Sequence, residues 1–256
     1  MSTQREKAEE LRRLHEAPEP LVLVNAWDAA SARVVASVPG CRAIATASWS
    51  IAAAHGLPDG EVISREQMLA AVALVASAVD LPVTADLERG FGDASVTVAG
   101  AIEAGAVGCN LEDSTGTGGL WPVDEHAAVV AAARAAGEVA GVPIVINART
   151  DVFLEGEGGV DEAVERGREY LEAGADVIFV PGVSDLPTLE ALVAGIGPIS
   201  VFGTAGGPTL ADYARIGVKR VSYGPGPMGV AMAALKRAAE TLLAGGEPPA
   251  DLAFRP

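Results

Sequence analysis

Three short segments of this chain place acids, or an arginine beside an acid, directly after an apolar run. Asp86 and Glu88 end one such run, Glu112 ends a second, and Arg149 ends a third. Carboxylates gathered at one point raise one another's pKa unless a cation lies between them, and Mg²⁺ prefers oxygen ligands. An arginine can hold a carboxylate through two parallel hydrogen bonds. The residues therefore predict a divalent-cation site beside an arginine that binds a substrate carboxylate.

A plainer interpretation exists for each of these residues. The acids could be solvated loop residues or helix caps, and Arg149 could form an internal salt bridge with Asp151 or Glu112. The salt bridge and the binding role are compatible, because an arginine held by one acid is oriented for a ligand. Histidines and cysteines are missing from these segments, which argues against zinc.

Apolar runs and helix-like runs alternate along the whole chain. Glycine follows several of the helices and proline precedes several of the strands, and both residues end helices. The expected strands are 21–25, 43–47, 83–86, 107–111, 144–148, 177–180, 199–202 and 220–222. The expected helices are 3–16, 28–37, 64–79, 95–104, 124–140, 160–173, 185–194, 208–215 and 227–244.

Eight strand–helix pairs without a linker favour one closed (β/α)₈ TIM-type barrel over an open doubly wound sheet. We therefore expect a single domain over residues 1–256, with an additional N-terminal helix within 1–18 and a C-terminal tail at 245–256. The carboxyl ends of barrel strands carry the chemistry in such folds, which is where the acids and Arg149 fall.

Side-chain alternation along the strands sharpens this expectation. If Asp86, Glu112 and Arg149 face the barrel interior, the residues two positions earlier face it too, and the residues between face the helices. The interior set is then Thr84, Asn110 and Asn147, and the exterior set is Ala85, Leu111 and Ala148. Polar residues converging in the interior are costly unless water, a metal or a ligand satisfies them.

Composition narrows the classes of partner. The formal net charge is −16, from 34 acids against 18 lysines and arginines, so we expect neither a nucleic acid nor a membrane surface as a partner. An N-terminus without an apolar signal region predicts a cytoplasmic protein. Cys41 and Cys109 are expected to be core thiols, and His55 and His126 surface residues.

Two glycine-rich segments follow the seventh and eighth expected strands. They are 203–208, which contains Thr204, and 223–227. Many barrels bind ligands at these loops, but glycine is also ordinary in strand–helix turns. Thr204 is therefore a candidate substrate-binding residue.

Taken together, these motifs resemble the isocitrate lyase and phosphoenolpyruvate mutase superfamily over roughly residues 21–245. The pattern D-x-D-x-G-[YF]-G is similar to 86–92, x-L-E-D to 110–113, and A-R-[TV]-[DE] to 148–151. The segment 46–50, followed by 55–59, resembles the substrate-binding stretch after the second strand.

The resemblance implies an α/β barrel whose last helix is often exchanged between subunits, in a homodimer or homotetramer. It implies Mg²⁺ or Mn²⁺, and chemistry that makes and stabilises the enolate of a 2-oxo acid. The implied direct metal ligand is Asp86, with Glu88, Glu112 and Asp59 acting through waters; Asp59, Glu112 and Arg149 form the implied catalytic set. The implied substrate-binding residues are Arg149, Asn110, Thr204 and the backbone near Ala47, Ser48 and Trp49.

Departures from the superfamily patterns leave the reaction open. The loop 114–122 has no K-[KR]-C-G-H motif, and Ala47 and Pro181 stand where mutases carry Ser and His. The first hypothesis is a Mg²⁺-dependent carbon–carbon lyase, similar to 2-methylisocitrate lyase, acting on a small 2-hydroxy or 2-oxo carboxylate. The second is a mutase or hydrolase acting on a P–C bond or on oxaloacetate. The third is a binding protein for 2-oxo acids without catalysis.

Overall fold

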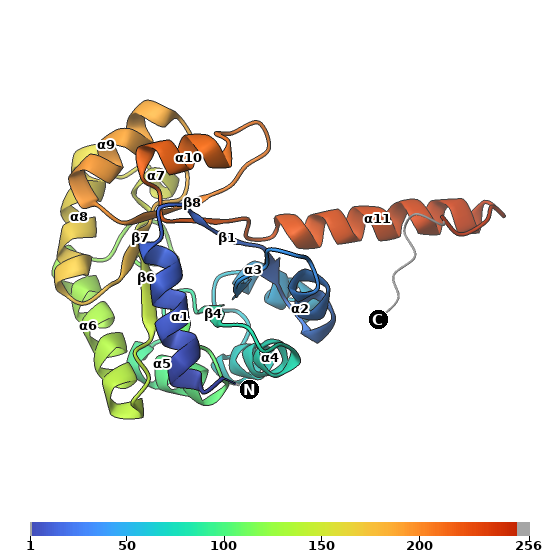
Figure 1. Ribbon diagram of the computed structural model, residues 1–256, viewed down its shortest axis with the longest axis horizontal. Helices are drawn as coiled ribbons and strands as arrows, with labels where there is room; N and C mark the ends of the chain where they lie inside the picture. The colour runs from blue at the N-terminus through green and yellow to red at the C-terminus, as the bar shows by residue number, and fades with distance from the viewer. Residues whose placement is uncertain (1, 250–256) are drawn as a thin grey trace.

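The fold is a parallel β-barrel surrounded by helices, as the sequence predicts (Figure 1). The computed structural model describes residues 2–249, so most of the expected C-terminal tail lies outside the described residues. All strand pairs are parallel, in the order β1-β9-β8-β7-β6-β5-β4-β3-β2. The strands are β1 (Leu21–Leu23), β2 (Asn25–Ala26), β3 (Ile44–Thr46), β4 (Val83–Asp86), β5 (Gly108–Glu112), β6 (Val145–Arg149), β7 (Val177–Phe179), β8 (Ile199–Phe202) and β9 (Arg220–Ser222).

The first expected strand is split into two short pieces. β1 pairs with β9, whereas β2 pairs with β3, so the segment from Leu21 to Ala26 connects the two ends of the sheet. The eight expected strands thus become nine elements without a change of topology, and the barrel nearly closes on itself.

The expected helices are all present, and two short ones were not expected. The helices are α1 (Gln4–Glu16), α2 (Ala29–Ala36), α3 (Ser48–Ala54), α4 (Arg65–Ala78), α5 (Ala94–Glu103), α6 (Val123–Ala140), α7 (Val152–Glu155), α8 (Val160–Glu172), α9 (Leu186–Ile196), α10 (Leu210–Ile216) and α11 (Gly226–Leu243). The sequence analysis missed α3 and α7, because they are short and have no side chain capping their first turn. None of the helices in residues 2–249 has the length and apolar character needed to cross a membrane.

The packing partners of the strand residues confirm the alternation along the strands. Ala85, Leu111 and Ala148 are at most 1 % exposed and pack in the main apolar cluster under the helices. Asn110 and Asn147 hydrogen-bond to each other inside the barrel, 2.8 Å apart. The barrel therefore has a polar interior near its carboxyl end and an apolar exterior.

Helix α1 lies across the barrel (Figure 1). Its Leu11 is fully buried, and a Cβ placed on Gly108 of β5 would lie 2.8 Å from Leu11 Cδ2. Only a glycine at position 108 leaves room for this side chain, so α1 seals the floor of the barrel.

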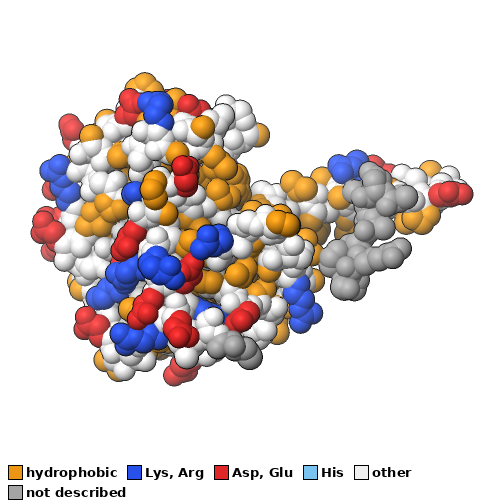
Figure 2. Space-filling view, viewed as in Figure 1, with side chains coloured by type: hydrophobic (Ala, Val, Ile, Leu, Met, Phe, Trp, Pro, Cys, Tyr) orange, Lys and Arg blue, Asp and Glu red, His pale blue; other side chains and the backbone are white. Residues whose placement is uncertain are grey.

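Helix α11 is the exception to the helical layer, because it projects away from the barrel (Figure 1). Among its described residues only Met228 is buried, while Val230, Leu235 and Leu243 are 72 %, 62 % and 89 % exposed. Hydrophobic side chains are visible along this arm and at its base (Figure 2).

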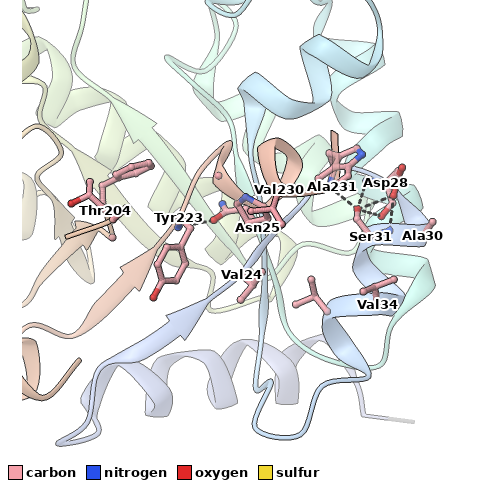
Figure 3. Close-up of a pocket in the computed structure, with 17 residues that line it drawn as sticks. Val24, Asn25, Asp28, Ala30, Ser31, Val34, Thr204, Tyr223, Val230 and Ala231 are labelled. Atoms are coloured by element: carbon pink, nitrogen blue, oxygen red, sulfur yellow. Dashed lines mark hydrogen bonds between the residues drawn. The ribbon is translucent and has the colours of Figure 1, made fainter. Parts of the chain in front are cut away.

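A large apolar groove lies between the start of α11 and α2. It encloses about 890 Å³, and Figure 3 shows Val24 and Val34 facing it, with Val230 and Ala231 at the start of α11.

Candidate active site

A cavity of about 420 Å³ lies at the carboxyl ends of the strands. Eight of the ten predicted site residues line it: Ala47, Ser48, Trp49, Asp59, Asp86, Asn110, Arg149 and Thr204. Glu88 and Glu112 do not line it, and both are buried close to those that do. The strand ends therefore meet at one place, as the alternation pattern predicts.

Asp86 is the last residue of β4, and the start of α3 holds it. The backbone N–H of Ser48 donates to Asp86 Oδ2 over 3.0 Å, and the Ser48 hydroxyl donates to the same oxygen over 2.9 Å. The Asp86 N–H donates to Thr46 Oγ1 over 2.9 Å. The Ser48 N–H, which the resemblance assigns to the substrate, is thus occupied by Asp86 in this structure.

Glu112 and Arg149 are partners in the β5–β6 register and form an ion pair, with Nη1 and Oε2 2.8 Å apart. Arg149 Nε and Nη2 donate to the two oxygens of Asp151 over 2.6 and 2.9 Å. Burial opposes the charge on Arg149, but Glu112 and Asp151 outweigh it, so the pKa of Arg149 is raised. Both salt bridges considered from the sequence are present, and they orient the guanidinium beside the cavity.

The burial of Glu112 beside Arg149 disfavours the charged form of its carboxylate. Burial raises the pKa of Glu112 to about 7, although Arg149 opposes the shift. Arg89 contributes weakly, since its Nη1 lies 3.5 Å from Glu112 Oε1.

Glu88 is the most strained acid of the site. It is 2 % exposed, its φ of 49° lies in the left-handed region, and its Oε1 is buried without a hydrogen-bond partner. Burial, with Asp59 and Asp86 adding to it, raises the pKa of Glu88 to about 8. Burial and then Asp86 also raise the pKa of Asp59. A cation among these groups would relieve their mutual repulsion.

One residue that the sequence analysis missed, Glu61, connects the acidic loops. The Glu61 carboxylate accepts from the backbone N–H groups of Arg89, over 3.1 Å, and Phe91, over 2.7 Å. The Glu61 N–H in turn donates to Glu88 Oε2 over 2.5 Å. The loops after β3 and β4 are therefore clamped to each other. No spacing rule points to Glu61, because its role depends on two loops that meet only in the folded chain.

The donor set fits a hydrated hard cation better than a closed metal cage. Within residues 2–249, no three His, Cys, Asp or Glu side chains lie close enough to hold one ion together. Mg²⁺ commonly takes one or two carboxylates and keeps several waters. Asp86 on the cavity wall and the unpartnered Glu88 Oε1 are consistent with that mode of binding.

The loop between β5 and α6 forms a small glycine-rich turn. Ser114 and Leu120 pair across it, and the Gly119 N–H donates to Glu155 of α7 over 2.9 Å. Thr115 faces a separate cavity on the far side of Glu112. The turn presents no Cys, His or Lys to the site.

The prediction that His126 is a surface residue is wrong. It is 2 % exposed at the start of α6 and packs edge-on against Tyr170, with ring centroids 4.7 Å apart. Its place near a helix start suggested exposure, but the first turn of α6 packs onto α8. His55 is exposed, Cys109 is buried and Cys41 is half-buried.

Comparison with known proteins identifies the family. Residues 11–243 match the model of the phosphoenolpyruvate phosphomutase family. The chain belongs to this family. An uncharacterized protein of Mycobacterium tuberculosis is 31 % identical over 94 % of this chain and 92 % of its own length. The 2-methylisocitrate lyase of Bacillus subtilis is also 31 % identical, over 70 % of this chain and 60 % of its own.

Solved structures of the same superfamily share the fold over almost the whole chain. A Burkholderia cenocepacia protein, provisionally described as a phosphonomutase, is 46 % identical with a TM-score of 0.88, over 93 % of this chain and 99 % of its own. A 2,3-dimethylmalate lyase is 27 % identical with a TM-score of 0.86, over 100 % of this chain and 90 % of its own. Lyases and mutases thus share this barrel, so an enzyme of one of these kinds is indicated.

Two of the positions at which this sequence differs from the superfamily patterns line the cavity. Ala47 and Pro181, which stand in place of the Ser and His of mutases, both line it. Cavity chemistry must therefore rest on other groups.

Proposed function

We propose that this protein is a Mg²⁺- or Mn²⁺-dependent carbon–carbon lyase acting on a small 2-hydroxy or 2-oxo carboxylate. The observation that carries the proposal is the placement of Arg149 and Asp86 on the walls of one cavity of about 420 Å³. Pockets of this size hold small ligands, and a cation with an arginine is suited to a substrate that carries a carboxylate. The similarity to 2-methylisocitrate lyases supports the same reaction class.

The residues divide the work as follows. Arg149 binds the substrate carboxylate through the N–H groups that Glu112 and Asp151 leave free. Asp86 would hold the ion directly, with Glu88, Glu112 and Asp59 holding its waters. When bound, Mg²⁺ supplies positive charge that stabilises the enolate as the C–C bond breaks. Asn110 and Thr204 line the cavity and donate hydrogen bonds to the substrate.

The side chains of the cavity favour a 2-oxo acid over a 2-hydroxy acid. Its lining contains no Cys, His, Lys or Tyr, and besides Asp86 its candidates for proton transfer are Asp59, Ser48, Ser184, Thr204 and Ser222. Cleaving a 2-hydroxy acid requires a base for its hydroxyl proton. Loss of CO₂ from a 3-carboxy-2-oxo acid requires no base, because the electrons of the C–C bond pass directly into the enolate. An oxaloacetate decarboxylase of Ectopseudomonas mendocina is 29 % identical over 78 % of this chain and 72 % of its own length.

The test is a substrate panel with and without Mg²⁺. Oxaloacetate, 2-methylisocitrate, isocitrate and dimethylmalate should separate the 2-oxo from the 2-hydroxy acids, with pyruvate or glyoxylate release as the readout. EDTA and Asp86→Ala should abolish turnover, while the exposed control Asp80→Ala should not change it. Turnover that survives both EDTA and Asp86→Ala would refute the proposal.

Two alternatives have their own outcomes in the same experiment. A changed phosphorus NMR spectrum of phosphonopyruvate would indicate a P–C mutase or hydrolase, which the similarity to a Variovorax phosphonopyruvate hydrolase keeps open (33 % identical, 52 % of this chain and 49 % of its own). Calorimetric binding of 2-oxo acids with no turnover on any substrate would indicate a binding protein.

We also propose a homodimer or homotetramer in which α11 of one copy fills the groove of another. The groove between α2 and the start of α11 is apolar, and the projecting α11 exposes Val230, Leu235 and Leu243. Leu235→Glu should shift the mass measured by light scattering toward the monomer, whereas Glu240→Lys on the same helix should not. An unchanged mass in Leu235→Glu would contradict this assembly.

The free thiols of Cys41 and Cys109 fit the cytoplasmic location that we propose.

A further inference from the structure

Arg220 is a buried cation in the barrel interior that forms no salt bridge with any of the described residues. It belongs to β9 and is 1 % exposed, and within residues 2–249 no carboxylate lies within 4.0 Å of its guanidinium. Among the described residues its Nε and Nη1 have no hydrogen-bond partner, while Nη2 donates to Asn110 Oδ1 over 3.2 Å. Burying an unpaired charge is expensive, and an apolar side chain would serve packing better. Burial lowers the pKa of Arg220 to about 10, so it remains charged at neutral pH.

The partner of Arg220 is a residue of the candidate active site. Asn110 lines the cavity and is the register neighbour of Asp86 on β4 and of Asn147 on β6. Its Oδ1 accepts a second hydrogen bond, from Asn147 Nδ2 over 2.8 Å, and Ser200 Oγ in turn donates to Asn147 Oδ1 over 2.8 Å. Two donors on one oxygen determine which end of the Asn110 amide is the carbonyl.

The other end of that amide, Nδ2, is left for a ligand. It donates to no residue of the described chain, and it is not among the buried unpartnered atoms. Because Asn110 lines the cavity, Nδ2 is accessible from it. A hydrogen bond to a cation also polarises the amide, which makes its N–H a stronger donor.

We infer that Arg220 is a positioning residue that acts through Asn110, fixing and polarising the amide so that Nδ2 donates to a carboxylate or enolate oxygen of the substrate. This inference rests on the proposed function for the class of substrate, a 2-oxo acid. Arg220 is then a second arginine, besides Arg149, whose positive charge favours binding of an anionic substrate. The hydrogen-bonded set consists of Asn110 on β5, Asn147 on β6 and Arg220 on β9, and it includes no residue of the acidic loops.

Oxalate is a suitable probe, because it is a planar dianion that mimics the enolate of a 2-oxo acid and does not react. Its affinity is measured by calorimetry in the presence of Mg²⁺. Arg220→Met should weaken oxalate binding about 10- to 100-fold, since hydrogen bonds to charged groups contribute that much, and Arg220→Lys should restore part of the loss. Asn110→Asp keeps the shape but places an anionic oxygen where Nδ2 stands, so it should weaken oxalate binding further than Arg220→Met.

The matched control is Arg134→Met. Arg134 is also partly buried, but it binds the Gly174 carbonyl and Asp176, away from the cavity. It should leave oxalate affinity within about threefold of the wild type, well inside the smallest effect expected of a charged hydrogen bond. Thermal unfolding serves as the check on folding, and Met in place of an unpaired buried charge should not lower the melting temperature.

A purely structural role for Arg220 predicts a different result. Arg220→Met would then change the melting temperature while oxalate affinity stayed at the wild-type value, and this outcome overturns the inference. Wild-type binding of oxalate by Asn110→Asp overturns it as well.

Crystal structures of the wild type and Arg220→Met without ligand separate this inference from the proposed function. The wild-type amide should keep Oδ1 toward Arg220 and Asn147, and the amide in Arg220→Met should rotate or become disordered. If wild-type protein fails to bind oxalate, the proposed function fails, and these two structures still decide whether Arg220 positions Asn110. An unchanged amide in Arg220→Met refutes the inference.

Discussion

Replacing Arg149 by lysine tests the centre of the proposed site. An arginine has five N–H donors; on Arg149, Nε and Nη2 each donate one to Asp151, and Nη1 lies 2.8 Å from Glu112 Oε2 as an ion pair. At least one N–H on Nη1 or Nη2 therefore remains for a substrate carboxylate. A lysine has three donors, and two of them would be needed to satisfy the same two acids.

The variant Arg149→Lys thus keeps the charge and loses about one charge-assisted hydrogen bond to the ligand. Such a bond contributes about 1.5–3 kcal/mol, which corresponds to roughly a 10- to 150-fold loss of affinity. Arg149 is partly open to the cavity, with 22 % of its side chain exposed, so we expect the lower half of that range.

The assay is calorimetric titration of oxalate into protein saturated with Mg²⁺. The exposed Arg215, which pairs with Glu190 on the surface, supplies the control Arg215→Lys. The control should bind oxalate like the wild type, and the melting temperature of each variant excludes unfolding. A loss below about threefold in Arg149→Lys would refute the assignment of Arg149 as the carboxylate-binding residue, because it lies well below the roughly tenfold expected for a charge-assisted hydrogen bond to the ligand.

Two further perturbations test the acids and the barrel floor. Without divalent ions, Glu88 has a folded-state pKa of about 8, above its unfolded value, so the native protein should lose stability as pH rises from about 4.5 to 8. Glu88→Gln cannot titrate and should be more stable than the wild type at pH 8 by about 4 kcal/mol in urea unfolding, because the folded-state pKa lies about 3.5 above the unfolded value and each pKa unit corresponds to about 1.36 kcal/mol; equal pH slopes would contradict this. Gly108→Ala should lower the melting temperature, because the new Cβ would lie 2.8 Å from Leu11 Cδ2, and overpacking costs about 1–3 kcal/mol. An unchanged melting temperature would mean that α1 is free to shift off the barrel floor.

Much of the fold could be predicted because a (β/α)₈ barrel repeats a simple local pattern. Period-two alternation placed Asn110 and Asn147 in the interior and Leu111 outside, and the Asn110–Asn147 hydrogen bond and the packing of Leu111 in the main apolar cluster confirm this placement. The chemistry at strand ends followed from the same pattern, since parallel strands bring their carboxyl ends to one side.

The residues that could not be predicted depend on contacts between distant segments. Glu61 acts across two loops, and Arg220 lies 110 positions from the oxygen to which it donates. The sequence around each residue does not indicate its partner, because a charged side chain at such a position is as compatible with solvent exposure or a surface salt bridge as with the contact observed. Similarly, α11 has an ordinary helical sequence, and its departure from the barrel is a property of the packing around it.

The hydrogen bonds of Ser48 connect the cation site with the substrate site. The N–H and the hydroxyl of Ser48 both donate to Asp86 Oδ2, so they can donate to a substrate only after the Asp86 carboxylate moves away from them. A cation bound near Asp86 would favour this movement, because a carboxylate interacts more strongly with a cation than with two neutral hydrogen-bond donors. Substrate binding would then reinforce cation binding by the same factor, as linkage requires of any two coupled sites. On the proposed function, the acidic cluster and the anion-binding groups would therefore act together, because an ion that relieves the repulsion among the acids would also free the Ser48 donors for a 2-oxo acid.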